Sequence, residues 1–307
     1  MSYEKELREL SKRLEEEYLR SYSTQIGKVA KKRLLGTLFF NLHELRKNFE
    51  ENLDPFVLIS IEQRMNWISD WLTQEAWGHF FGNLYLIERS LYYNNRPEIK
   101  NRLHWTVGDL YTAHVLILQG NNLSDSLGSA FLDRLAGIVK VDCQLIDIGD
   151  KEFFKLAIIN LCTINSVLCD YLSLPDILAD QKTMAKKYLR SSFESLKSAF
   201  LKTALLADKI SLQLFIYRTL VSSAKILDEK IEFLQDHYID LLKQLETQIS
   251  KLNAYDRILS LCSLYYLSKE KFTELFEKIF EGLSSEVNWV NRPFYVKMLI
   301  LYLRDRK

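Results

Sequence analysis

The sequence predicts an all-α protein, and three features lead to this prediction. Proline and glycine are scarce, with 4 Pro and 10 Gly among 307 residues, so turns are few and the elements between them are long. Apolar residues recur at helical spacing along most of the chain. Hydrophobic residues make up 48% and charged residues 26%, as in an ordinary globular protein. We expect about twelve helices in a solenoid-like array of helical hairpins, a toroid or a packed multi-helix bundle.

The first three helices have recognisable boundaries. An apolar seam with Glu-to-Arg pairs four residues apart marks a helix over residues 5–18. A second helix runs from about residue 24 to residue 49. Asp54 and Pro55 then supply the N-cap and the first-turn proline of a third helix, which extends to about Tyr93.

Glycines interrupt or end the helices that follow. Gly78 and Gly82 lie inside the third helix, and we expect a kink or a break there because glycine is a poor helix former. Asn95 begins a fourth helix, which Gly120 ends as a residue suited to a left-handed cap. Ser124 opens a shorter fifth helix.

Residues 139–148 carry an alternating pattern. Apolar Val139, Val141, Cys143 and Leu145 alternate with polar residues, which is the period of a strand. A lone strand has no ladder partner, so an extended connector or a helix end explains the pattern better than a sheet. The fold prediction therefore includes at most one short strand-like connector here.

Composition changes after Gly149, because the rest of the chain contains one glycine, Gly282, and two prolines, Pro175 and Pro293. This half is predicted to be nearly continuous helix. Helix starts are expected at Asp150, Pro175, Asp208, Asp228, Asn253, Ser268 and Arg292. We place a boundary between two helical regions, 1–149 and 150–307, at this change, and one continuous domain is the alternative.

Charge and cysteine usage exclude several classes of protein. Lys plus Arg (41) and Asp plus Glu (40) leave a formal net charge of +1, so no whole-protein field attracts nucleic acid. The four cysteines include no Cys-x-x-Cys pair, which fits free thiols in a reducing compartment. The charged N-terminus lacks the apolar core of a secretory signal, and apolar runs fall short of the ~20 residues of a spanning helix. We expect a cytoplasmic protein without a membrane partner.

The segment 65–118 is the most unusual in the chain, since it holds four of the five Trp and three of the five His. Large rings beside glycines suit either close helix packing or a slot for a ligand. One interpretation is the aromatic core of the N-terminal half. The other is a groove for a peptide or partner helix, lined by Trp67, Trp71, Gln74, Trp77, Phe81, Tyr85, Trp105 and Tyr111.

The same segment supports an enzymatic alternative. Glu75 and His79 lie four residues apart on one helical face, and Asp109 and His114 supply a second acid/base pair. The sequence contains no Gly-x-Ser-x-Gly, Walker A, Gly-x-Gly-x-x-Gly or His-Glu-x-x-His motif, so we expect no cofactor and no metal. Such an enzyme would act on a small organic or peptidic substrate.

A basic stripe follows one face of a helix in the second half. It consists of Lys182, Lys186, Arg190 and Lys197. The stripe can bind an acidic peptide or a phosphate backbone, but a solvated helix face is the default interpretation of this pattern.

These observations favour a non-enzymatic helical interaction protein: an adaptor, regulator or accessory factor that binds a peptide or partner protein in the aromatic-lined groove. Near-neutral charge and the lack of a catalytic motif favour it over an enzyme. A nucleic-acid partner is not expected, and the sequence leaves open whether the chain forms a homo-oligomer.

Overall fold

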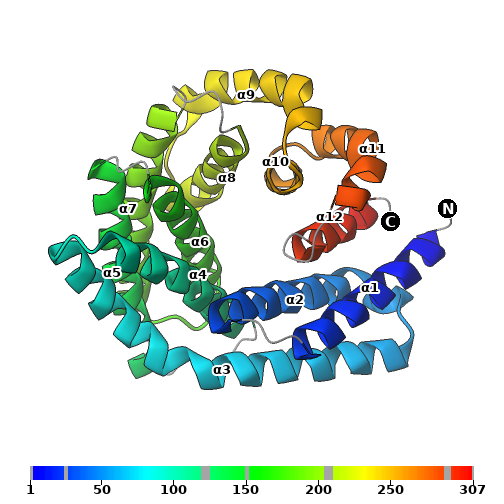
Figure 1. Cartoon of the computed structure of the whole chain (residues 1–307), viewed down its shortest axis with the longest axis horizontal. Coiled ribbons are helices and arrows are strands. Elements are labelled where there is room, and N and C mark those ends of the chain that lie inside the picture. Colours follow the sequence, from blue (N-terminus) through cyan, green and yellow to red (C-terminus); the bar gives the residue numbers. More distant parts are fainter. Residues whose placement is uncertain are drawn as a thin grey trace. The chain divides into compact units, whose positions relative to one another are not determined.

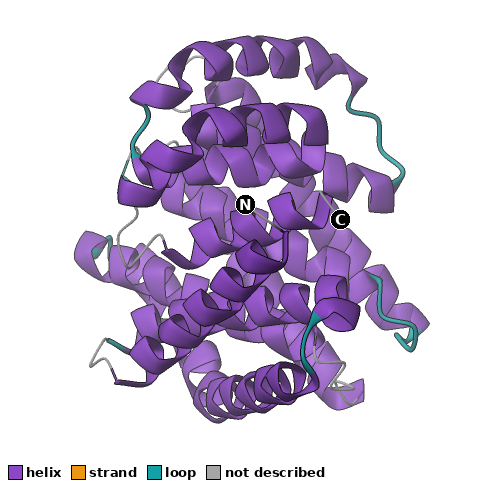
Figure 2. Ribbon diagram, turned by 90° about the vertical axis from the view of Figure 1, so that its right-hand side faces the viewer, coloured by secondary structure: helices purple, strands orange, loops and turns teal. Residues whose placement is uncertain are grey.

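The computed structural model describes residues 3–23, 27–118, 125–148, 152–203, 210–286 and 292–305. These residues form twelve α-helices and three short 3₁₀ helices, with no strand among them. Figures 1 and 2 show that the helices pack against one another, so the all-α prediction is confirmed. The α-helices are α1 Tyr3–Ser23, α2 Lys28–Phe49, α3 Pro55–Tyr92, α4 Arg96–Leu118, α5 Asp125–Ile148, α6 Phe154–Leu172, α7 Ala179–Thr203, α8 Ile210–Leu227, α9 Gln235–Gln248, α10 Ala254–Leu267, α11 Lys269–Glu286 and α12 Arg292–Asp305.

The chain divides into two compact units. Unit 1 comprises residues 1–74 and 244–307, and unit 2 comprises residues 75–243. In unit 1, α2 packs against α1 and α12, and α10 packs against α11 and α12. In unit 2, α6 packs against α4, α5, α7 and α8. The boundary predicted after Gly149 falls inside unit 2.

Helix α6 is the centre of unit 2, and eleven of its 19 residues are buried. Ile158, Leu161, Ile164 and Leu168 are all completely buried, and each such side chain contributes roughly 1.5–3 kcal/mol. Neighbours on several sides are needed to cover these residues, and Figure 1 shows α6 among α4, α5, α7 and α8. Of the described helices, α6 alone is long and apolar enough to cross a membrane, and 56% of it is buried inside the protein.

The strand-like pattern at residues 139–148 is not extended, because all ten residues belong to α5. Val139, Asp142, Leu145 and Ile146 are buried, and their spacing of three, three and one is that of a helix face. A strand would have exposed Asp142 while burying Cys143, but Asp142 is the more buried of the two. Packing against α6 and α7 selects the helix, so the extended connector is wrong and the helical alternative is correct.

Helix α3 continues through Gly78 and Gly82, where a kink or break was expected. Each glycine costs about 1 kcal/mol relative to alanine, and the helix of 38 residues tolerates this cost. Its ends follow the sequence signals. Asp54 accepts a hydrogen bond from the backbone N–H of Phe56 at 2.8 Å, and Asn94 adopts a left-handed φ of 51° just after the helix.

The helix starts predicted in the second half have different outcomes. Asn253 caps α10, because its Oδ1 accepts a hydrogen bond from the backbone N–H of Asp256 at 2.9 Å. Ser268 directly precedes α11 as expected. The start predicted at Asp228 is wrong: this residue has a left-handed φ of 56° and follows the end of α8, a role that Asp and Asn share with glycine. The predicted boundaries at Gly120, Ser124, Asp150 and Asp208 lie outside the described residues.

A buried acid lies in α5, which packs against α6 in unit 2. Asp142 of α5 and Asn160 of α6 are both completely buried. Burial raises the pKa of Asp142 well above its ordinary value, and the nearby Asn160 side chain offsets only part of that shift. The carboxyl group therefore favours its neutral form in the folded protein.

Replacing Asp142 by Asn should make the protein more stable than the wild type above pH 4. In the unfolded chain Asp142 ionises near pH 4, whereas the folded protein keeps the proton until its raised pKa, so wild-type stability falls through this window by about 1.4 kcal/mol per pH unit. The amide of the Asp142→Asn variant cannot ionise, so the variant escapes this loss. Urea unfolding from pH 4 to 8 measures the difference.

The matched control is Asp147→Asn, because Asp147 is exposed on the same helix. This variant should follow the wild-type pH dependence closely. Equal pH profiles for Asp142→Asn and the wild type would contradict a neutral Asp142.

Candidate functional site

Two side chains of the predicted groove are described, and both contact neighbouring helices of unit 1. The ring of Trp67 lies edge-to-face against Tyr18 of α1, with centroids 5.6 Å apart. Arg64 supports the same contact, because its guanidinium lies 5.2 Å from the Tyr18 ring and binds Glu15 at 2.7 Å. Helix α1 thus covers part of the α3 face that carries Trp67, and Trp67 itself remains half-buried.

Trp71 lies one turn further along α3 and is also half-buried. The ammonium group of Lys31 on α2 lies 4.9 Å from the centroid of its ring. This is a cation–π contact, which favours a fixed position of the indole. Trp67 and Trp71 are therefore rings held in place by side chains of α1 and α2.

The structure does not describe the side chains of the other predicted groove residues. Gln74 is the last residue of unit 1 in this part of the chain, and the remaining positions belong to unit 2. Their side chains lie outside the described part of the structure, as do those of the predicted acid/base pair Glu75 and His79. These positions are Gln74, Trp77, Phe81, Tyr85, Trp105 and Tyr111.

The second predicted acid/base pair has a different geometry from the one expected. His114 Nε2 forms a hydrogen bond with the carboxylate of Asp170 on α6, while Asp109 is buried, with 3% of its surface exposed. A carboxylate that holds an imidazole fixes the orientation and tautomer of the ring. Asp170 lies 56 residues from His114 in sequence, and no motif pointed to it.

The cysteines of unit 2 are protonated thiols rather than nucleophiles. Burial raises the pKa of Cys162 to about 12 and that of Cys169 to about 11. Burial also raises the pKa of Cys143. Because the thiolate is the reactive form, these three residues do not supply a nucleophile at neutral pH.

The basic stripe lies on α7, and most of it faces solvent. Lys182, Lys186 and Arg190 are exposed, and Arg190 Nε lies 3.5 Å from a carboxylate oxygen of Glu229. Lys197 is half-buried and lies 3.5 Å from Glu194. The two carboxylates neutralise half of the stripe, which weakens its attraction for a polyanion.

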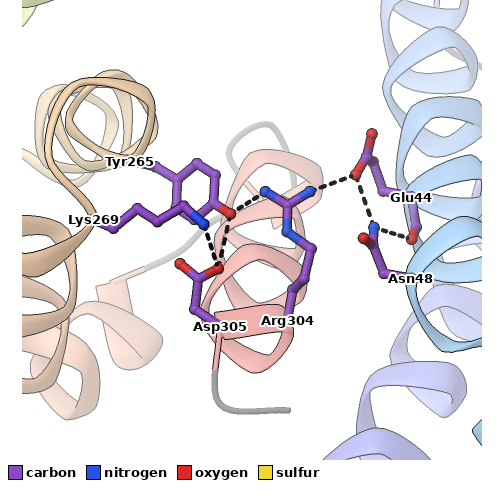
Figure 3. A network of polar contacts seen from close by, with 6 residues as sticks. All are labelled: Glu44, Asn48, Tyr265, Lys269, Arg304 and Asp305. Carbon is purple, nitrogen blue, oxygen red and sulfur yellow. Dashed lines mark hydrogen bonds and ion pairs between the residues drawn. The ribbon is translucent and has the colours of Figure 1, made fainter.

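A polar network joins four helices of unit 1, α2, α10, α11 and α12 (Figure 3). Arg304 of α12 donates a hydrogen bond to the hydroxyl oxygen of Tyr265 on α10, and its Nη1 lies 3.4 Å from Oε2 of Glu44 on α2. The Tyr265 hydroxyl in turn lies 3.2 Å from Oδ1 of Asp305, as does Nζ of Lys269. Burial raises the pKa of Tyr265, so the phenol remains a donor to Asp305. The network fastens α12 to α2, α10 and α11.

No family model matches the chain, and neither the curated proteins nor the solved structures contain a significant match. In the described part of the chain, no three His, Cys, Asp or Glu side chains come together as metal ligands. A functional proposal therefore depends on the chemistry of the described surfaces.

Replacing Arg304 by Met should lower the free energy of unfolding by about 1–2 kcal/mol, because Tyr265 and Glu44 lose a charged hydrogen-bond partner. Arg304→Lys should restore only part of the loss, since a single ammonium lacks the fork that serves both groups. Urea unfolding measures both variants. Lys251→Met, at an exposed position of unit 1, is the control, and an equal effect of the two Met substitutions would contradict the role of the network.

Proposed function

We propose that this chain is a non-enzymatic helical interaction protein, an adaptor, regulator or accessory factor of the cytoplasm that binds a peptide or partner protein through aromatic side chains. The observation that carries the proposal is the exposure of large rings. Tyr92 is 83% exposed, Phe56 81% and Tyr93 67%. Single exposed apolar residues are common, but Tyr92 and Tyr93 are adjacent, and aromatic residues are enriched where proteins bind one another.

The half-buried tryptophans support the same proposal at a second place. Trp67 and Trp71 are held by Tyr18 and Lys31, so little side-chain entropy remains to be lost when a partner covers them. Rigid aromatic anchors of this kind supply much of the binding free energy at protein interfaces. We therefore propose that these two rings form part of the groove for a peptide or partner helix.

Affinity capture with the full chain tests this function. The immobilised wild-type protein should recover a partner from an extract of the source cells, identified by mass spectrometry and then measured with the purified partner by calorimetry. Trp67→Ala/Trp71→Ala should weaken that binding at least tenfold while circular dichroism shows a folded protein. Tyr266→Ala, which removes a half-exposed ring of unit 1, should bind like the wild type. Failure to recover any partner would contradict the function.

The hydrogen bond between His114 and Asp170 favours a second candidate function, an enzyme acting on a small organic or peptidic substrate. An imidazole oriented by a carboxylate is the arrangement of a general base. A thermal-shift screen of small molecules would identify a ligand that raises the unfolding temperature. If this candidate is correct, the protein should convert such a ligand chemically, and His114→Gln should abolish turnover while the unfolding temperature stays unchanged. Binding without turnover would exclude it.

A further inference from the structure

The turn between α3 and α4 presents two adjacent tyrosines to solvent. We name it the tyrosine turn, residues 89–100. The rings of Tyr92 and Tyr93 contact each other edge-to-face, with centroids 5.0 Å apart, and the guanidinium of Arg89 lies 5.9 Å from the Tyr93 ring. The two rings therefore form one projecting aromatic surface that belongs entirely to unit 2.

The backbone of the tyrosine turn is well fixed. The N–H of Asn95 donates to the carbonyl of Ser90 at 2.9 Å, and the N–H of Asn94 donates to the carbonyl of Leu91 at 3.1 Å. Asn94 adopts the left-handed conformation that such a helix end needs. Because the turn is fixed before binding, a partner would not have to order it.

The tyrosine turn carries three exposed cationic side chains. Arg89, Arg96 and Lys100 are exposed, and the last two share one carboxylate, Glu152, at 3.0 and 3.7 Å. Among the described residues Arg89 forms no ion pair. The turn also contains Glu98, which is paired with Arg102 of α4. The four cations outnumber the two carboxylates, so an excess of positive charge remains in this part of the surface.

The edge-to-face arrangement of the two tyrosine rings favours one class of anionic partner over another. Successive bases of a single-stranded nucleic acid stack on open ring faces, but the rings of Tyr92 and Tyr93 stand at 90°, and Arg89 lies over Tyr93. Protein interfaces use Tyr and Arg together as anchors without a need for parallel faces. An acidic protein segment fits the tyrosine turn better than a nucleic acid does.

We propose that the tyrosine turn binds an acidic segment of a partner protein, whose apolar side chains cover Tyr92 and Tyr93 while its carboxylates pair with Arg89 and Lys100. This assignment rests on the proposed interaction function and gives it a surface and a partner chemistry. Charge complementarity sets the orientation and the rate of association, and burial of the two rings provides the affinity.

Selection from a library of random twelve-residue peptides displayed on phage, against the full-length protein, tests the assignment. Enriched peptides should carry several Asp or Glu residues around an apolar residue. Synthetic copies should bind Tyr92→Ser/Tyr93→Ser at least tenfold more weakly than the wild type, and Arg89→Glu/Lys100→Glu should weaken binding similarly. Binding to the wild type should also weaken as salt increases.

Two control variants test whether the loss of peptide binding is specific to the tyrosine turn. Phe56→Ser removes an equally exposed ring from unit 1, and Lys182→Glu/Lys186→Glu reverses two exposed charges of the basic stripe. Both should bind the peptides like the wild type, and all variants should keep the wild-type urea midpoint.

Three results would overturn the assignment: selection that enriches no acidic peptide, equal binding of the peptides to the wild type and the tyrosine variant, or tyrosine-dependent binding of oligothymidylate in place of peptide. Its failure is distinguishable from failure of the proposed function. A partner captured by the wild type that also binds Tyr92→Ser/Tyr93→Ser leaves the function intact and places the binding surface elsewhere, whereas capture of no partner removes the function itself.

Discussion

Unit 2 is organised by the need to bury α6. Eleven of the 19 residues of this helix are buried, among them Ile158, Leu161 and Leu168. An apolar surface of that extent requires neighbours on each side, which α4, α5, α7 and α8 supply. The positions of the other helices in the unit follow from this requirement, and so do the His114–Asp170 contact and the burial of the cysteines.

Polar groups inside unit 2 add specificity to this apolar packing. Asn165 donates to Ser223 at 3.0 Å, and Tyr171 donates to the side-chain oxygen of Gln181 at 3.0 Å. A buried polar group that loses its partner costs about 1–3 kcal/mol, so these pairs favour one register of α6 against α8 and α7. In unit 1, the polar contacts lie nearer the surface. The Arg304 network lies where α12 meets α2 and α10, and it is partly open to water.

The surfaces with functional interest are those that this packing leaves uncovered. The tyrosine turn exposes two rings because it connects two helices at a place where no other described helix covers them. In the interior of unit 2, by contrast, burial raises the pKa values of Asp142 and Cys162, which favours the neutral forms of these two groups. We therefore place the proposed function at the exposed rings and not among these buried groups.

The sequence by itself determined the helical character of the chain and several of its boundaries. Asp54, Asn253 and Ser268 act at helix starts through hydrogen bonds within a few residues, and such local interactions are readable from spacing alone. In the sequence, Tyr92 and Tyr93 are part of a Tyr-Tyr-Asn-Asn-Arg-Pro run, which does not predict that they are exposed. Exposure depends on which surfaces the rest of the fold covers.

The tertiary structure decided what local patterns left ambiguous. Residues 139–148 fit both a strand and a helix face, and burial against α6 and α7 selected the helix. Arg304 meets Glu44 across 260 residues, and His114 meets Asp170 across 56. The physical reason is that capping energies act over one helical turn, whereas partners of this kind are chosen by packing of the whole unit, which no local spacing encodes.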